Sequence, residues 1–176
     1  AQMAPTVSDD ANLRTLYRIS EESVRATDSL DSLLQRVLDL TIEAVGADRG
    51  CMLVSESTSE RILPRVFSHR TGGNPQDRMP ISTSIVKYVI SRGEGVWTSD
   101  ASHDSRFVPG QSIVQAGIRE AMCVPMQGRY ELMGVIYVDI TSPADYLMGG
   151  GSPKAFRVEL LTLLLEIGRP SALAVE

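Results

Sequence analysis

The chain has 176 residues, of which 43% are hydrophobic and 22% are charged, and its formal net charge is −5 at pH 7. This length suits one domain with a substantial core, and an acidic balance without a clustered basic face argues against nucleic acid as a partner. No apolar run approaches a membrane span, and the N-terminus lacks the pattern of a signal peptide. We therefore expect a cytoplasmic protein that does not contact the membrane.

The N-terminal part of the chain predicts a short tail followed by a helix. We expect residues 1–8 to form a disordered segment and residues 9–176 to form a single domain. Apolar residues at helical spacing predict an amphipathic helix over residues 9–27. Its stripe is formed by Leu13, Leu16, Tyr17, Ser20 and Val24.

A second helix is predicted over residues 30–45. Ser29 is a suitable N-cap, and Gly46 is a suitable C-terminal stop. The apolar stripe of this helix is wide, which predicts that it packs on a sheet.

Two strands and a shorter helix are predicted next. Residues 49–55 form an apolar run typical of a central strand. Residues 62–69 form a second strand, in which Pro64 cannot donate a ladder hydrogen bond and therefore indicates a place near the sheet edge. A helix over residues 83–92 follows, with Ser82 as its N-cap.

The region between this helix and the last strands is mixed in character. Residues 96–98 predict a short strand, and residues 99–111 predict a polar loop. One or two helical turns are possible over residues 112–117.

A hairpin over residues 121–126 and 132–140 is the organising element of the predicted sheet. Gly128 in the connecting turn is expected to supply a positive φ angle. The second strand alternates between two largely apolar faces, so we expect the sheet to be covered on both sides. One face carries Leu132, Gly134, Ile136, Val138 and Ile140, and the other carries Met133, Val135, Tyr137 and Asp139.

The C-terminal helix is predicted over residues 153–169. Its leucines spread over more than one face, which favours burial against the sheet and against a partner, as in a homodimer formed through the terminal helices. Pro170 would lose the hydrogen bond to the Glu166 carbonyl, so the helix is expected to kink or stop there.

Both cysteines, Cys51 and Cys123, lie in apolar strand-like runs. We expect them to be buried free thiols. A disulfide is possible only if their strands are neighbours.

Several phrases, in their order and spacing, resemble the GAF domain, a small-molecule-sensing and dimerisation module of signalling proteins. The phrases are Val45–Gly50, Gly93–Trp97, Asp100–Ala101 with Asp104–Phe107, Met122–Met126 and Met133–Asp139. The run from Gln111 to Met126 is similar to bacterial GAF domains that sit beside FHA domains. The resemblance implies an α+β fold with a mainly antiparallel sheet of five or six strands. It places the terminal helices on one face and pocket-forming loops and short helices on the other.

The sequence contains no phosphate-binding loop, nucleophile elbow or zinc-protease motif. His69 and His103 are far apart, and neither has a second ligand at metal spacing, so neither a metal nor a cofactor is expected. Bilin-attaching members of the resembled family commonly have histidine after the cysteine, and its methionine sulfoxide reductases use several cysteines. Neither pattern is present, and we do not expect an enzyme.

The candidate ligand-binding residues come from the hairpin and the loop before it. Tyr137 and Asp139 are polar groups on an otherwise apolar strand face, which can orient a ligand. The other candidates are Asp100, Asp104, Arg106, Phe107 and Arg119. An alternative is that Asp104 and Arg106 only fix the loop, and that Phe107 plugs the pocket.

Two functions are therefore in competition. The chain is either a non-catalytic sensory domain that binds an unknown small molecule or a ligand-free dimerisation module of the same signalling protein. It begins without methionine and has no output domain, so we expect it to be part of a longer protein that includes one.

Overall fold

The computed structural model describes residues 7–24, 29–56, 59–70, 81–101, 104–107, 117–141, 156 and 158–176. Within them, no helix is long and apolar enough to cross a membrane. The elements in chain order are α1 (Val7–Val24), α2 (Leu30–Val45), β1 (Arg49–Glu56), β2 (Ser59–His69), α3 (Thr83–Arg92), β3 (Val96–Thr98), β4 (Glu120–Gln127), β5 (Leu132–Ile140) and α5 (Val158–Val175).

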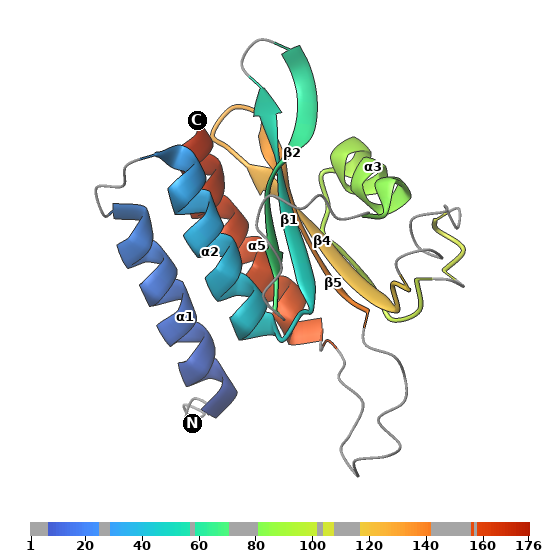
Figure 1. Ribbon diagram of the computed structural model, residues 1–176, viewed down its shortest axis with the longest axis horizontal. Helices are drawn as coiled ribbons and strands as arrows, with labels where there is room; N and C mark the ends of the chain where they lie inside the picture. The colour runs from blue at the N-terminus through green and yellow to red at the C-terminus, as the bar shows by residue number, and fades with distance from the viewer. Residues whose placement is uncertain are drawn as a thin grey trace, which may run out of the picture.

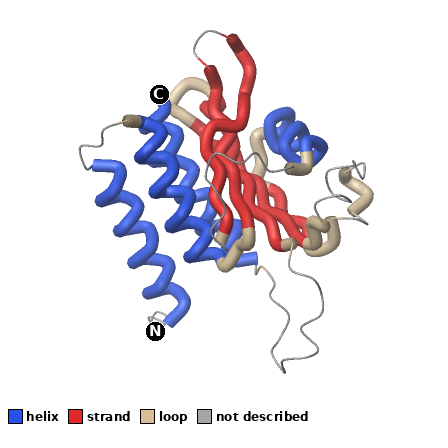
Figure 2. The backbone as a smooth tube through the Cα atoms, in the orientation of Figure 1, coloured by secondary structure: helices blue, strands red, loops and turns tan. Residues whose placement is uncertain are grey.

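The strands form one five-stranded antiparallel sheet in the order β2-β1-β5-β4-β3. Helices α2 and α5 cover one face, with α1 packed outside them, and α3 lies on the other face (Figure 1). Figure 2 shows the same layers, with α1, α2 and α5 on one side of the strands. The predicted α+β fold class is confirmed.

Local signals place the two capped helices where the sequence predicts them. The Ser29 side chain accepts the N–H of Ser32 at 3.1 Å, and Gly46 ends α2 in the left-handed conformation with φ 72°. In the same way, Ser82 accepts the N–H of Ile85 at the start of α3. These caps satisfy backbone groups that a helix end leaves unpaired.

Strand β5 divides the core into two parts. Its side chains Ile136, Val138 and Ile140 lie in the core beneath α2 and α5. Val135 and Tyr137 lie in a second core on the other face, together with the buried side of α3. Both faces are covered, and the predicted alternation is confirmed from Val135 to Ile140. It is wrong at Met133, which lies in the core beneath α2 and α5 because the pairing of β4 with β5 shifts register beside it.

Pro64 lies in β2, an edge strand, as its missing N–H predicts. Cys51 and Cys123 are both buried free thiols. Each is the register partner of Tyr137 on the strand between them. They are separated by two strand spacings, roughly 10 Å, which is too far for a disulfide.

The bounds of the first helix differ from the prediction. Residues 7 and 8, expected to be disordered, belong to α1, and residues 25–27, expected to be helical, lie outside the described residues. The apolar stripe begins only at Leu13, so hydrophobic spacing could not show where the helix starts. Residues 1–6 and the predicted helical turns at 112–116 also lie outside the described part of the chain.

The C-terminal helix begins later than predicted and continues past Pro170 to Val175. An internal proline costs a helix about 3 kcal/mol. Here the turns on both sides of it are buried, through Ile167, Ser171 and Ala172. Packing of this face therefore outweighs the local cost. The helix does not stop at Pro170, and the alternative of a kink there stays a prediction.

The β4–β5 turn also differs from its prediction. Gly128 does not have the expected positive φ angle. Its N–H instead donates to the Glu131 carbonyl at 2.9 Å, across a longer loop. A Cβ atom at position 128 would lie 2.8 Å from the Cγ of Met133, so space rather than φ requires glycine there.

Candidate functional site

A charged network is buried on the sheet face that carries α3, at one end of β1 and β5. Arg49, the first residue of β1, is the register partner of Asp139 near the end of β5. Its Nε donates to Asp139 Oδ1 at 3.0 Å and its Nη2 to Oδ2 at 2.6 Å. The Tyr137 hydroxyl donates to the same Oδ2 at 2.8 Å. Asp139 is fully buried, and the Arg49 side chain is 12% exposed.

Burial governs the electrostatics of this network. Burial raises the pKa of Asp139, while the hydrogen bonds and the charge of Arg49 act to lower it. Burial, the charge of Asp139 and its hydrogen bond raise the pKa of Tyr137 well above its ordinary value. The phenol therefore stays protonated and donates to a carboxylate that Arg49 neutralises.

The sequence predicts Tyr137 and Asp139 as candidates, but it does not predict Arg49, which the structure brings to them. One signal was available. Asp139 lies on an otherwise apolar strand, and a buried carboxylate needs a cation or several hydrogen-bond donors as partners. Arg49 opens the strand that becomes the neighbour of β5, but that pairing is not local in sequence.

A second group of predicted residues forms a loop beside β3. Asp104 accepts hydrogen bonds from the Arg106 backbone N–H at 3.1 Å and from its guanidinium at 3.0 and 2.7 Å. Arg106 also donates to the Trp97 carbonyl at 2.9 Å, which occupies a backbone acceptor of the edge strand β3. The Phe107 ring is buried and packs edge-on against Tyr88, with ring centroids 5.3 Å apart.

Arg119 and Asp100 are the two remaining candidates. The Arg119 backbone bridges two segments, since its N–H donates to the Ile140 carbonyl at 2.9 Å and its carbonyl accepts from Ala101 at 3.0 Å. Its guanidinium lies 3.8 Å from Glu120. Asp100 is exposed. A ligand-binding role for the seven candidates stays a prediction.

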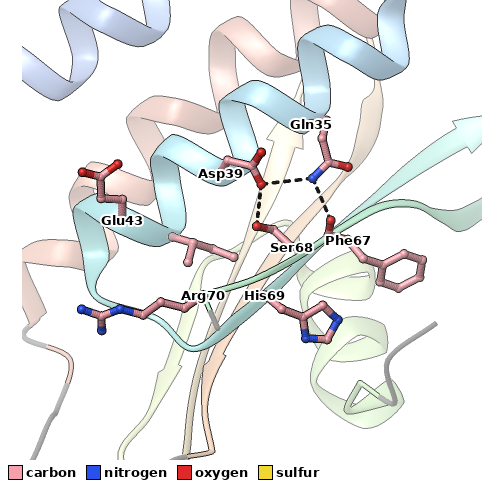
Figure 3. Close-up of a pocket in the computed structure, with 8 residues that line it drawn as sticks. Gln35, Asp39, Glu43, Phe67, Ser68, His69 and Arg70 are labelled. Atoms are coloured by element: carbon pink, nitrogen blue, oxygen red, sulfur yellow. Dashed lines mark hydrogen bonds between the residues drawn. The ribbon is translucent and has the colours of Figure 1, made fainter. Parts of the chain in front are cut away.

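A groove of about 410 Å³ lies at the edge of the sheet, on the face that α2 covers, between α2 and the end of β2 (Figure 3). Its polar groups bind one another: Ser68 donates to Asp39 at 2.6 Å, and Gln35 donates to Asp39 at 3.1 Å and to the Phe67 carbonyl at 2.8 Å. None of the predicted site residues lines it. These bonds tie α2 to the edge strand.

The sequence model of the GAF domain family matches residues 29–174, most of the chain. The chain belongs to the GAF domain family. Its fold is similar to the GAF domain of a phosphoenolpyruvate-protein phosphotransferase from Coxiella burnetii, with a TM-score of 0.72, 16% identity and coverage of 97% and 95% of the two chains. The corresponding Acinetobacter GAF domain has a TM-score of 0.68, 21% identity and coverage of 98% and 94%.

Among curated proteins, the GAF domain is 28% identical over 119 residues to a probable 3′,5′-cyclic phosphodiesterase of Caenorhabditis elegans. This match covers 61% of the chain but only 16% of the relative's length. It therefore compares one domain with a small part of a larger protein.

Among the described residues, no group of three or more histidine, cysteine or acidic side chains is placed to hold a metal ion. The thiols of this GAF domain are poor nucleophiles. Burial raises the pKa of Cys51 to about 12 and raises that of Cys123 further, so neither forms a thiolate near neutral pH.

We expect neither cysteine to react with Ellman's reagent at pH 8 while the domain is folded, because reaction requires an exposed thiolate. Both should react at once in denaturant, giving two thiols per chain. Rapid reaction of the folded protein would contradict the burial of the Cys51–Tyr137–Cys123 row.

Replacing Asp104 by asparagine is expected to reduce the free energy of unfolding by about 1 kcal/mol at pH 7, a value discounted for the exposure of the loop. The Arg106 hydrogen bond lowers the pKa of Asp104 below its ordinary value of 3.8. A lowered folded-state pKa stabilises the fold above the ordinary pKa, and this stability is lost as the pH falls through the folded pKa.

The difference between the wild type and Asp104→Asn should therefore shrink steadily below about pH 4. Urea denaturation at several pH values measures it, with the exposed Glu94→Gln as the control. A difference that persists unchanged at pH 2 would contradict this origin.

Proposed function

We propose that this GAF domain is a sensory domain that binds a small molecule over the α3 side of the sheet, at the Arg49–Asp139 end. GAF domains are regulatory domains that bind small molecules. The observation that carries the proposal is the charged network within an otherwise apolar core. Binding sites for small molecules commonly combine an apolar lining with a few placed polar groups.

The arrangement of β5 supports coupling between such a site and the helices. Tyr137 contributes to the network, while its neighbours Ile136 and Val138 pack beneath α2 and α5. A ligand that shifts β5 would therefore change packing on both faces. We infer that the domain acts in signal transduction, within a cytoplasmic protein that also contains an output domain, without catalysis of its own.

Native mass spectrometry of the purified domain, compared with its denatured mass, tests the proposal. A small-molecule adduct that is lost on denaturation is the expected result, and its mass identifies the ligand class. A bare chain mass, together with no rise in melting temperature against a panel of metabolites, would overturn the proposal.

A second candidate function, dimerisation, is favoured by the outer face of α1. Leu13 and Tyr17 lie one helical turn apart and are 62% and 66% exposed. Two large apolar side chains side by side on an outer helix favour a protein contact.

Sedimentation analysis of the wild type and of Leu13→Glu/Tyr17→Glu distinguishes this candidate. A homodimer that the double variant dissociates supports dimerisation through the terminal helices, and Leu63→Glu on β2 is the control at a half-exposed leucine. A wild type that is monomeric at high concentration would overturn it.

A further inference from the structure

We propose that Arg49 and His69 form the subsite that recognises a planar oxygen acceptor of the ligand, either an amide-type carbonyl or a carboxylate. The inference rests on the proposed ligand-binding function and specifies its chemistry. It comes from two neighbouring side chains whose polar groups are not satisfied within the described part of the chain.

Arg49 uses only one edge of its guanidinium. Asp139 occupies the edge formed by Nε and Nη2, and Arg49 has no other side-chain hydrogen bond within the described residues. The end-on edge, formed by Nη1 and the second hydrogen of Nη2, therefore keeps its donors free. That edge has the fork geometry that matches two lone pairs of a carbonyl or carboxylate. The Arg49 side chain is 12% exposed, so a ligand can reach these donors although they are largely shielded from bulk water.

His69 is the neighbour of Arg49 on the side away from Asp139. The two residues are register partners on β2 and β1, so their Cβ atoms are about 5 Å apart on the same face. The Nε2 atom of His69 is buried, and it has no hydrogen-bond partner among the described residues. A buried polar atom left without a partner is costly, so an occupant that bonds to it is favoured.

The charges at the subsite restrict the occupant. The positive charge of Arg49 is already balanced by Asp139, so the subsite does not attract anions strongly. Directional hydrogen bonding rather than net charge then selects the ligand, and a neutral carbonyl fits as well as a carboxylate. A ligand cation would face Arg49 and is disfavoured.

The test uses the whole chain with ¹⁵N-labelled arginine and histidine, and the probes are acetamide and sodium acetate. NMR spectra follow the guanidinium signals of Arg49 and the ring signals of His69 during each titration. We expect saturable shifts of both residues, with a dissociation constant on the order of 10 mM for probes this small. Saturation by acetamide assigns a carbonyl, and saturation by acetate alone assigns a carboxylate.

Arg49→Lys is the informative variant, because lysine keeps the charge beside Asp139 but lacks the fork. It should weaken probe binding at least tenfold, while Arg14→Lys on exposed α1 should leave binding unchanged. Should Arg49→Lys fail to fold, His69→Phe tests the same subsite, and the wild-type signals report it directly.

Arg49 and His69 signals that do not saturate with either probe would overturn the subsite. Probe binding that survives both variants would do the same. A retained adduct in native mass spectrometry together with silent Arg49 signals would leave the sensory function intact and reject only this inference.

Discussion

Replacing Arg49 by methionine should reduce the free energy of unfolding by about 3–5 kcal/mol. The change leaves the Asp139 carboxylate fully buried, and the Tyr137 hydroxyl is then its one side-chain donor among the described residues. Removing one partner of a buried ion pair is costly because the remaining charge has lost its solvent and its counter-ion. Urea denaturation followed by circular dichroism measures the loss.

The exposed pair formed by Arg65 and Asp31 provides the matched control. Its side chains are 40% and 60% exposed, so Arg65→Met should cost less than about 1 kcal/mol. The double variant Arg49→Met/Asp139→Leu should recover much of the stability, since no buried charge remains. Equal costs for Arg49→Met and Arg65→Met would show that the buried pair is not what holds this end of the sheet.

Replacing Gly134 by alanine should be nearly as damaging, at about 3 kcal/mol. The added Cβ would lie 2.1 Å from the Leu53 carbonyl oxygen on β1. That atom belongs to the backbone of a central strand, held between β2 and β5, so it cannot move aside as a flexible side chain would. Thermal and urea denaturation measure the cost.

Gly93 is the control for the effect of glycine alone. Its φ angle is +66°, but a Cβ there would meet nothing within 4 Å. Gly93→Ala should therefore cost only the conformational strain, about 1 kcal/mol. If both alanine variants lose the same stability, the steric explanation for Gly134 is wrong.

The parts of the fold that were predictable are those with local physical causes. Ser29, Gly46 and Ser82 act on backbone groups within one helical turn, so their roles can be read from neighbouring residues. The alternation of β5 is likewise local. The stop at Pro170 does not occur, because the cost of the proline is local, whereas the burial of α5 that offsets it depends on β4 and the rest of the sheet.

The candidate site was only partly predictable for the same reason. Tyr137 and Asp139 are two residues apart on one strand, so their shared face follows from strand geometry. Arg49 is 90 residues from Asp139 in sequence, and only the pairing of β1 with β5 brings them together. Asp104 and Arg106 lie within one loop, and their mutual hydrogen bonds could be anticipated.

The Arg49–Asp139 pair also has a consequence for how the chain folds. Strands β1 and β2 are neighbours in sequence, as are β4 and β5, whereas the pairing of β1 with β5 joins residues as far apart as Arg49 and Asp139. Such a pairing closes a long loop, which slows folding. A slip of one residue would turn the Asp139 carboxylate into the apolar core under α2 and α5, away from Arg49. The buried charge thus disfavours a misaligned sheet, and the register that pairs Asp139 with Arg49 is favoured over its neighbours.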